Sequence, residues 1–207
     1  MIGGRIESAF AGLAETLRAE VRDLIESSGL LRLLDEEFGS SSLVGSADLD
    51  LMTWRDMDIY VPVERADLAG FLEAMPAIHA ALESGGYLPF RATFNDEWLR
   101  PRGSYGSGFY WGLRTGGPNQ DEWKIDLWGW ERETYEAKLR QHDELKKALA
   151  KADRELVLRL KHEAMRLPGF RQTITTYDVY RFVLAGHGDT LTQLLSFVGG
   201  RASDSSR

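Results

Sequence analysis

The spacing of apolar residues divides the first part of the chain into helical and extended segments. Over residues 6–25, apolar side chains recur every three or four positions, which predicts an amphipathic helix. Residues 30–38 predict a second, shorter helix that ends at Gly39. Residues 40–44 are short and apolar, which is typical of a buried strand. Two helices and a strand therefore precede the first polar motif.

The middle of the chain predicts most of a sheet. Residues 56–63 alternate polar and apolar positions, as expected for a strand with one buried face. Residues 64–82 predict a helix. Three further strands are predicted, at residues 87–94, 109–114 and 122–130, and a loose glycine-containing hairpin joins the last two.

Beyond Trp130 the pattern becomes helical and charged. Residues 131–166 predict a long charged helix, which Leu167-Pro168-Gly169 ends. Two more helices are predicted over residues 176–184 and 189–197, and a polar tail follows from Gly199.

This order of elements predicts an α+β fold, a mixed β-sheet flanked by helices with a helical carboxy-terminal part. We expect three regions: a core with amino-terminal helices over residues 1–130, a helical region over 131–198 and a disordered tail over 199–207.

Composition narrows the classes of function. The chain of 207 residues is 43% hydrophobic, enough to bury a core, and its lack of cysteine excludes disulfides, thiolate metal sites and a cysteine nucleophile. The net charge of −7 disfavours nucleic acid as a partner. No apolar run approaches the roughly 20 residues that span a bilayer, and the amino terminus lacks a signal-peptide layout. We expect a soluble cytoplasmic protein.

The most informative stretch joins Gly45-Ser46 to Asp56-Met57-Asp58 across a nine-residue gap. Glycine lets a phosphate approach the backbone, and a helix that starts there offers unpaired N–H groups. Residues i and i+2 of a strand share a face, so Asp56 and Asp58 converge. Two close carboxylates repel each other unless a cation lies between them, and Mg²⁺ prefers such hard oxygen ligands.

A third carboxylate is expected from a neighbouring strand. Asp126 lies between Ile125 and Leu127, as an inward-facing carboxylate of a strand would. Lys124 shares the face of Asp126, where it could hold that carboxylate ionised or contact a phosphate.

Together, Gly45-Ser46, Asp56-x-Asp58 and the isolated Asp126 resemble the signature of the DNA polymerase β-type nucleotidyltransferase superfamily. In size and layout the chain is most similar to its small stand-alone bacterial enzymes, which include those that adenylylate aminoglycosides and lincosamides. The motif-bearing resemblance covers residues 40–130.

The resemblance implies a role for each matching residue. Asp56 and Asp58 would bind one or two Mg²⁺ ions, and Asp126 would bind metal or accept the proton of the attacking hydroxyl. Gly45 and Ser46 would hold the triphosphate. Further nucleotide-binding candidates are Arg55, beside the metal pair, and Lys161, on the long helix after the sheet. The implied substrates are a nucleoside triphosphate, with ATP preferred, and a small molecule with a hydroxyl group.

Several alternatives remain open at this point. Asp48-Leu49-Asp50 is a rival metal pair, although acids near a helix start also serve the helix dipole. Arg55 and Lys161 could simply be solvated. The aromatic side chains could stack on a base or an acceptor, or pack in the core; they are Trp98, Tyr105, Tyr110, Trp111, Trp128 and Trp130. The alternative functions are nucleotidylation of a protein or tRNA, as in toxins, and non-catalytic nucleotide sensing.

Overall fold

The computed structural model describes residues 3–99, 106–119 and 121–204. The chain forms two compact units. One is Thr16–Asp143, and the other combines the residues up to Glu15 with those from Glu144 onward. The first part of α6 (Arg132–Leu149) belongs to the unit that contains the sheet.

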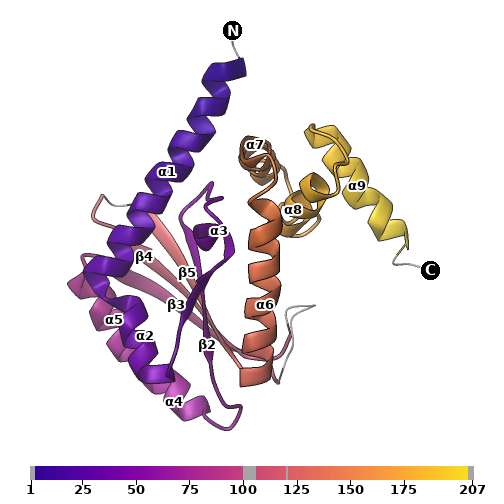
Figure 1. Cartoon of the computed structure of the whole chain (residues 1–207). Helices are drawn as coiled ribbons and strands as arrows, with labels where there is room; N and C mark the ends of the chain where they lie inside the picture. The colour runs from indigo at the N-terminus through magenta and orange to yellow at the C-terminus, as the bar shows by residue number, and fades with distance from the viewer. Residues whose placement is uncertain (1–2, 100–105, 120, 205–207) are drawn as a thin grey trace. The chain divides into compact units, whose positions relative to one another are not determined.

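A mixed five-stranded sheet forms the centre of the first unit (Figure 1). Its spatial order is β1-β2-β5-β4-β3, in which β2 and β5 are parallel and the other neighbours antiparallel. The strands are β1 (Ser42–Val44), β2 (Asp56–Pro62), β3 (Leu88–Asp96), β4 (Phe109–Gly116) and β5 (Glu122–Trp130). The prediction of an α+β fold with a mixed sheet is confirmed.

The helices of this unit that come before β5 either precede β1 or lie between two strands in sequence. They are α1 (Gly3–Ser28), of which residues from Thr16 belong to this unit, α2 (Leu30–Phe38), α3 (Gly45–Asp48), α4 (Leu68–Glu73) and α5 (Met75–Ser84). The single helix predicted over residues 64–82 is therefore two helices. Pro76 lies in the first turn of α5, where its missing N–H is not needed, and so favours a new helix start there.

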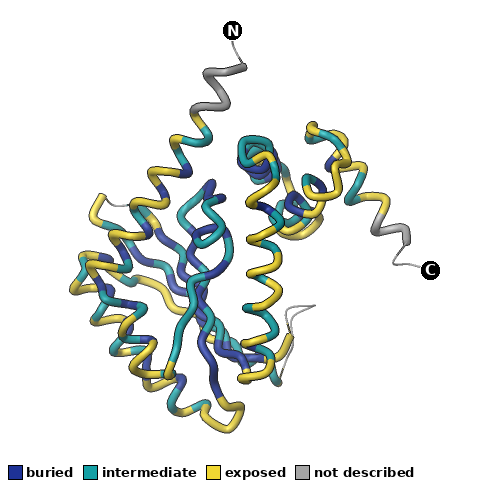
Figure 2. The backbone as a smooth tube through the Cα atoms, viewed as in Figure 1, coloured by how far each residue is buried: buried dark blue, intermediate teal, exposed yellow. Residues whose placement is uncertain are grey.

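One face of the sheet forms the apolar core with α2, α4 and α5, which Figure 1 shows together on one side of the strands. Phe71 on α4 is central to this core, because its ring centroid lies 5.2 Å from that of Phe109, 5.6 Å from that of Trp111 and 5.7 Å from that of Phe38. Figure 2 shows β2 and β5 largely buried, whereas the edge strand β3 is mostly exposed. The buried part of this sheet is therefore its centre.

The second unit contains α7 (Arg154–Met165), α8 (Thr176–Leu184) and α9 (Leu191–Asp204). Its core is formed by residues such as Leu160, Val179, Phe182 and Leu194. A capping box between Thr175 and Asp178 begins α8 at the predicted residue. By contrast, α9 extends through the two glycines at 199 and 200, where the sequence predicted a disordered tail.

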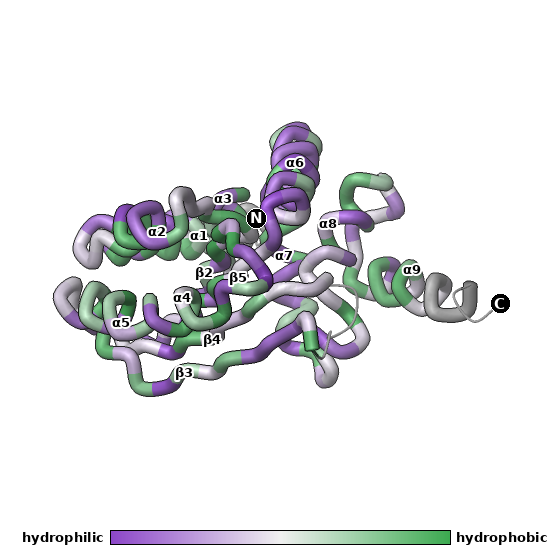
Figure 3. The backbone as a smooth tube through the Cα atoms, turned by 90° about the horizontal axis from the view of Figure 1, so that it is seen from below, coloured by the Kyte–Doolittle hydropathy of each residue, from purple (hydrophilic) through white to green (hydrophobic). Residues whose placement is uncertain are grey.

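The long charged helix predicted over residues 131–166 is divided into α6 and α7. Asp153 begins α7 by accepting a hydrogen bond from the backbone N–H of Leu156 at 3.0 Å. As predicted, α6 is charged, and Figure 3 shows it as mostly hydrophilic. Within the described ranges, no helix combines the length and apolarity needed to cross a bilayer.

Candidate active site

The parallel pairing of β2 and β5 places the predicted carboxylates side by side. In this register Asp58 is the Cα partner of Asp126, and Asp56 is the partner of Lys124. Side chains of paired residues share a face of the sheet. The three aspartates therefore lie on one face, opposite the apolar core.

Lys124 lies at the centre of this charged group. Its Nζ donates to Asp56 Oδ1 at 3.0 Å and also contacts Asp126 Oδ2. Asp56 and Asp126 are only 7% and 8% exposed, so both charges are largely removed from water. Burial of such charges is unfavourable unless they are paired, and the ammonium of Lys124 supplies that pairing.

The pKa values in the cluster follow from burial and from these charges. Burial raises the pKa of Asp126 above its ordinary value, although Lys124 acts in the opposite direction. Burial alone would lower the pKa of Lys124, but the carboxylates of Asp56 and Asp126 more than offset it, and the pKa is raised. Asp58 also raises it, which places this third carboxylate within electrostatic range.

Two aromatic donors complete the hydrogen bonding of the cluster. The Tyr110 hydroxyl donates to Asp126 Oδ1 at 2.9 Å, and the Trp54 indole N–H donates to Asp56 Oδ2 at 2.9 Å. Burial, followed by the charge of Asp126, raises the pKa of Tyr110, so the phenol stays protonated and remains a donor. Neither contact was predicted from the sequence.

Tyr110 reaches Asp126 by crossing Gly112. Gly112 is the Cα partner of Asp126 on β4, and a Cβ at position 112 would lie 2.4 Å from the Tyr110 hydroxyl oxygen. A side chain there would therefore displace the tyrosine. The spacing of Tyr110 and Gly112 in the sequence indicates this contact only when the register of β4 against β5 is known.

Gly45, the first residue of α3, faces Asp58. Its φ of +66° favours glycine, and a Cβ at position 45 would lie 2.3 Å from Asp58 Oδ2. Ser46 follows at the start of α3 and is buried. The structure thus brings the Gly45-Ser46 segment to the aspartates.

The donor set fits a hard divalent cation, because it consists of carboxylate oxygens. Nevertheless, among the described residues no group of three acidic or histidine side chains is already arranged as a metal-binding set. The ammonium of Lys124 lies between Asp56 and Asp126 and supplies positive charge there. Asp56, Asp58 and Asp126 are the residues that would bind Mg²⁺.

Arg55 has carboxylate partners of its own. Its guanidinium donates to both carboxylate oxygens of Glu20, at 2.7 and 2.8 Å, and lies 2.9 Å from Asp121. The hydrogen bond to Glu20 is the main reason that the pKa of Arg55 is raised. Arg55 is therefore half-buried and ion-paired rather than simply solvated, and these contacts favour a structural role.

Lys161 lies in the second unit and is 1% exposed, so the alternative of a solvated helix face is wrong. Its Nζ donates to the Tyr180 hydroxyl at 3.3 Å and lies 5.4 Å from the centroid of that ring. Its predicted contact with a triphosphate stays a prediction.

The two aspartates of the rival pair each have an ion-pair partner from a different helix. Asp48 pairs with His142 on α6 at 2.8 Å, and Asp50 pairs with Arg18 on α1 at 3.4 Å. Asp48, at the end of α3, thus connects to α6, whereas Asp50, in the segment between α3 and β2, connects to α1. This arrangement favours β2 as the source of the predicted metal pair.

The aromatic candidates have different environments. Trp111 and Trp130 are buried, and Trp98 packs on Phe109. Tyr110 and Trp128 lie on the same face as the aspartates, with ring centroids 4.6 Å apart. On this face, the Tyr110–Trp128 pair is the next residue pair along β4 and β5 from the pair of Gly112 and Asp126. Tyr105 lies outside the described residues.

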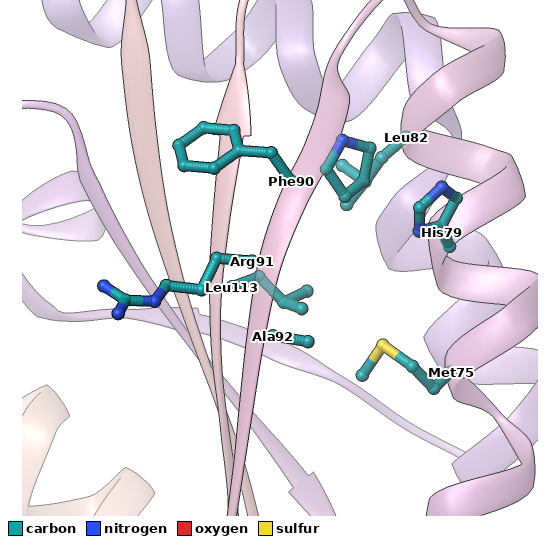
Figure 4. A pocket seen from close by; sticks show the side chains of 8 residues that line it. Met75, His79, Leu82, Phe90, Arg91, Ala92 and Leu113 are labelled. Atoms are coloured by element: carbon teal, nitrogen blue, oxygen red, sulfur yellow. The ribbon is translucent and has the colours of Figure 1, made fainter.

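A separate cavity of about 250 Å³ lies between α5 and β3 (Figure 4). Its lining is mainly apolar and includes Met75, Leu82 and Leu113, with His79 as a polar member. Leu113 and Gly112 are adjacent on β4 and point to opposite faces, so this cavity lies on the side of the sheet away from Asp126. It is therefore separate from the carboxylate cluster.

Comparisons with known proteins give no match to a protein-family model and no match among curated proteins. Among solved structures, the chain is similar to the Cid1 poly(U) polymerase, with 15% identity and a TM-score of 0.48 over 84% of this chain and 53% of that one. It is similar to Cid1 in complex with the UTP analogue UMPNPP, with 16% identity and a TM-score of 0.48 over 87% and 52%. A cytoplasmic RNA terminal U-transferase gives 17% identity and a TM-score of 0.44 over 85% and 52%. The chain spans about half the length of these solved chains.

Proposed function

We propose that this chain is a Mg²⁺-dependent nucleotidyltransferase, which transfers a nucleoside monophosphate from a nucleoside triphosphate to the hydroxyl of a small molecule. The observation that carries the proposal is the direct pairing of Asp58 with Asp126 across β2 and β5. The pairing sets two carboxylates from separate strands beside Asp56 on one face. ATP is the donor we expect.

The reaction that suits this site is an in-line substitution at the α-phosphorus. A bond forms between the acceptor oxygen and that phosphorus, and the bond to the bridging oxygen breaks, so that pyrophosphate leaves. The acceptor proton would pass to Asp126, the carboxylate that the second strand of the pair contributes. When bound, Mg²⁺ neutralises charge on the phosphates and orients them.

The other residues position the reactants. Asp56 and Asp58 would hold the metal-bound triphosphate, and Gly45, which has no side chain, leaves room for the carboxylate of Asp58. Tyr110 holds the carboxylate of Asp126 in place through its hydroxyl. Positioning and charge neutralisation account for most of the catalysis in phosphoryl transfer.

The net charge of −7 supports a small acceptor, because a net negative charge disfavours association with a polyanion. Nucleotidylation of tRNA or a protein side chain uses the same chemistry at the phosphate. The two classes of acceptor are therefore separated by which acceptor yields a labelled product.

The experiment is a pyrophosphate-release assay with each of the four NTPs, Mg²⁺ and a panel of hydroxyl-bearing small molecules, tRNA and peptides. We expect release with ATP and a small molecule. Asp58→Asn should abolish release, whereas the matched variant Asp143→Asn, at an exposed position of α6, should retain it. Equal release by Asp58→Asn and the wild type would contradict the proposal.

A further inference from the structure

The carboxylate cluster contains a cation that belongs to the chain itself. Lys124 lies between Asp56 and Asp126, and the exposed fractions of these three side chains are only 14%, 10% and 11%. An ammonium so far from solvent has lost most of its hydration, so these carboxylates are its main compensation. Lys124 is therefore part of the cluster rather than a solvated neighbour.

The hydrogen bonds of the cluster define which carboxylates Lys124 joins. Asp126 accepts from the Tyr110 hydroxyl on one oxygen and contacts Lys124 with the other. Asp56 accepts from the Trp54 indole on one oxygen and from Lys124 on the other. A divalent ion that bridged Asp56 and Asp126 would have to displace the ammonium from between them.

Asp58 differs from the other two aspartates. It is less buried, and its carboxylate lies against Gly45 at the loop where phosphates are expected. The three carboxylates and the one ammonium together leave a charge that a single divalent ion neutralises. Two-metal sites instead need a second ion about 3.5–4 Å from the first.

We propose that Lys124 takes the place of a second metal ion, so that the site binds one divalent cation with its nucleotide, on the side of Asp56 and Asp58. This inference rests on the proposed function and adds the number of metal ions and the residue that determines it. Lys124 keeps Asp126 paired while the metal-bound nucleotide enters beside Gly45. Removal of the ammonium should open the site to a second ion.

The test measures Mn²⁺ binding by electron paramagnetic resonance in the presence of AMPCPP, an ATP analogue that cannot transfer its nucleotide. The wild type should bind one Mn²⁺ per chain with the spectrum of an isolated ion. Lys124→Met should bind two, with the spin coupling of a close pair. Lys138→Met is the matched control, because Lys138 is a partly buried lysine of the same unit that lies over the Trp130 ring, 4.2 Å from its centroid.

The outcomes of this experiment test the role of Lys124 and the proposed function separately. Two Mn²⁺ ions in the wild type would overturn the role of Lys124 and leave nucleotidyl transfer standing, whereas no AMPCPP-dependent Mn²⁺ would overturn both. One ion in a folded Lys124→Met variant would also overturn the inference. Lys124→Arg keeps the positive charge and should bind one ion like the wild type, so two ions there would count against it even if Lys124→Met fails to fold.

Discussion

The two faces of the β2–β5 pair are built from the same strands, but burial of side chains has opposite effects on stability on the two faces. On one face Met57, Ile59, Ile125 and Leu127 are almost fully buried, and their burial stabilises the fold. On the other face, carboxylates lie within contact of one ammonium, and their burial is unfavourable without that pairing.

The apolar face keeps the charged face in place. Three carboxylates within electrostatic range of each other would separate if their backbone could move. The paired strands prevent this, because the side chains between the aspartates are fixed in the core. Changes on the two faces should therefore separate stability from chemistry.

The largest expected effect is on the charged face. Asp126→Asn should lower turnover roughly 10²–10⁴-fold, as expected for the loss of a general base, and should largely spare nucleotide affinity. The measurements are pyrophosphate release and calorimetric titration with AMPCPP and Mg²⁺. A loss of affinity equal to that of Asp58→Asn would instead place Asp126 in a shared metal shell.

On the apolar face, Phe71→Ala should lower the free energy of unfolding by about 3–5 kcal/mol, because it leaves a cavity among packed rings. Urea denaturation measures this loss. Phe90→Ala is the matched control, because Phe90 is 61% exposed and the same substitution there should cost less than about 0.5 kcal/mol. Similar losses at both positions would contradict the assignment of the core.

A smaller effect is expected on the same charged face, at β4. Gly112→Ala should displace the Tyr110 hydroxyl from Asp126 and cost roughly 1.5–3 kcal/mol, the range for a hydrogen bond to a charged group. Gly116→Ala, with open space at its Cβ, should be nearly neutral in the same denaturation experiment. If Tyr110→Phe and Gly112→Ala act through the same contact, the double variant should lose no more than either single variant.

The smallest effect is expected outside the cluster, at Arg55. Arg55→Lys should cost about 1 kcal/mol or less, because its ion pairs with Glu20 and Asp121 are partly exposed. Calorimetry should give an unchanged affinity for AMPCPP with Mg²⁺. A clear loss of affinity would restore Arg55 as a phosphate ligand.

The sequence predicted elements best where local signals coincide with tertiary packing. The bounds of α2, α8 and β5 match the prediction: Gly39 ends α2 in a left-handed conformation, and a capping box begins α8. The extent of α9 was predicted poorly. Glycines indicate a break, but Phe197 and Val198 pack on the core of the second unit just before them, and the helix continues.

The candidate site was predictable only in part. Alternation along β2 and β5 put each aspartate on a polar face, and the presence of Lys124 on the face of Asp126 followed in the same way. The hydrogen-bond and ion-pair partners that other elements supply could not be predicted in this way. The contact of Tyr110 with Asp126 depends on the register of β4, and the contact of Arg55 with Glu20 joins residues far apart in sequence.

The parallel pairing of β2 with β5 also has a consequence for how the chain folds. Asp56 and Lys124 are 68 positions apart, and α4, α5, β3 and β4 lie between them in sequence. Contacts of such long range form slowly, because the entropy of closing the intervening segment is lost before they stabilise it. During synthesis, β2 emerges with its acidic residues long before their partner strand exists. The complete charged cluster thus forms only when the sheet is complete, because a chain shortened before β5 lacks both Lys124 and Asp126.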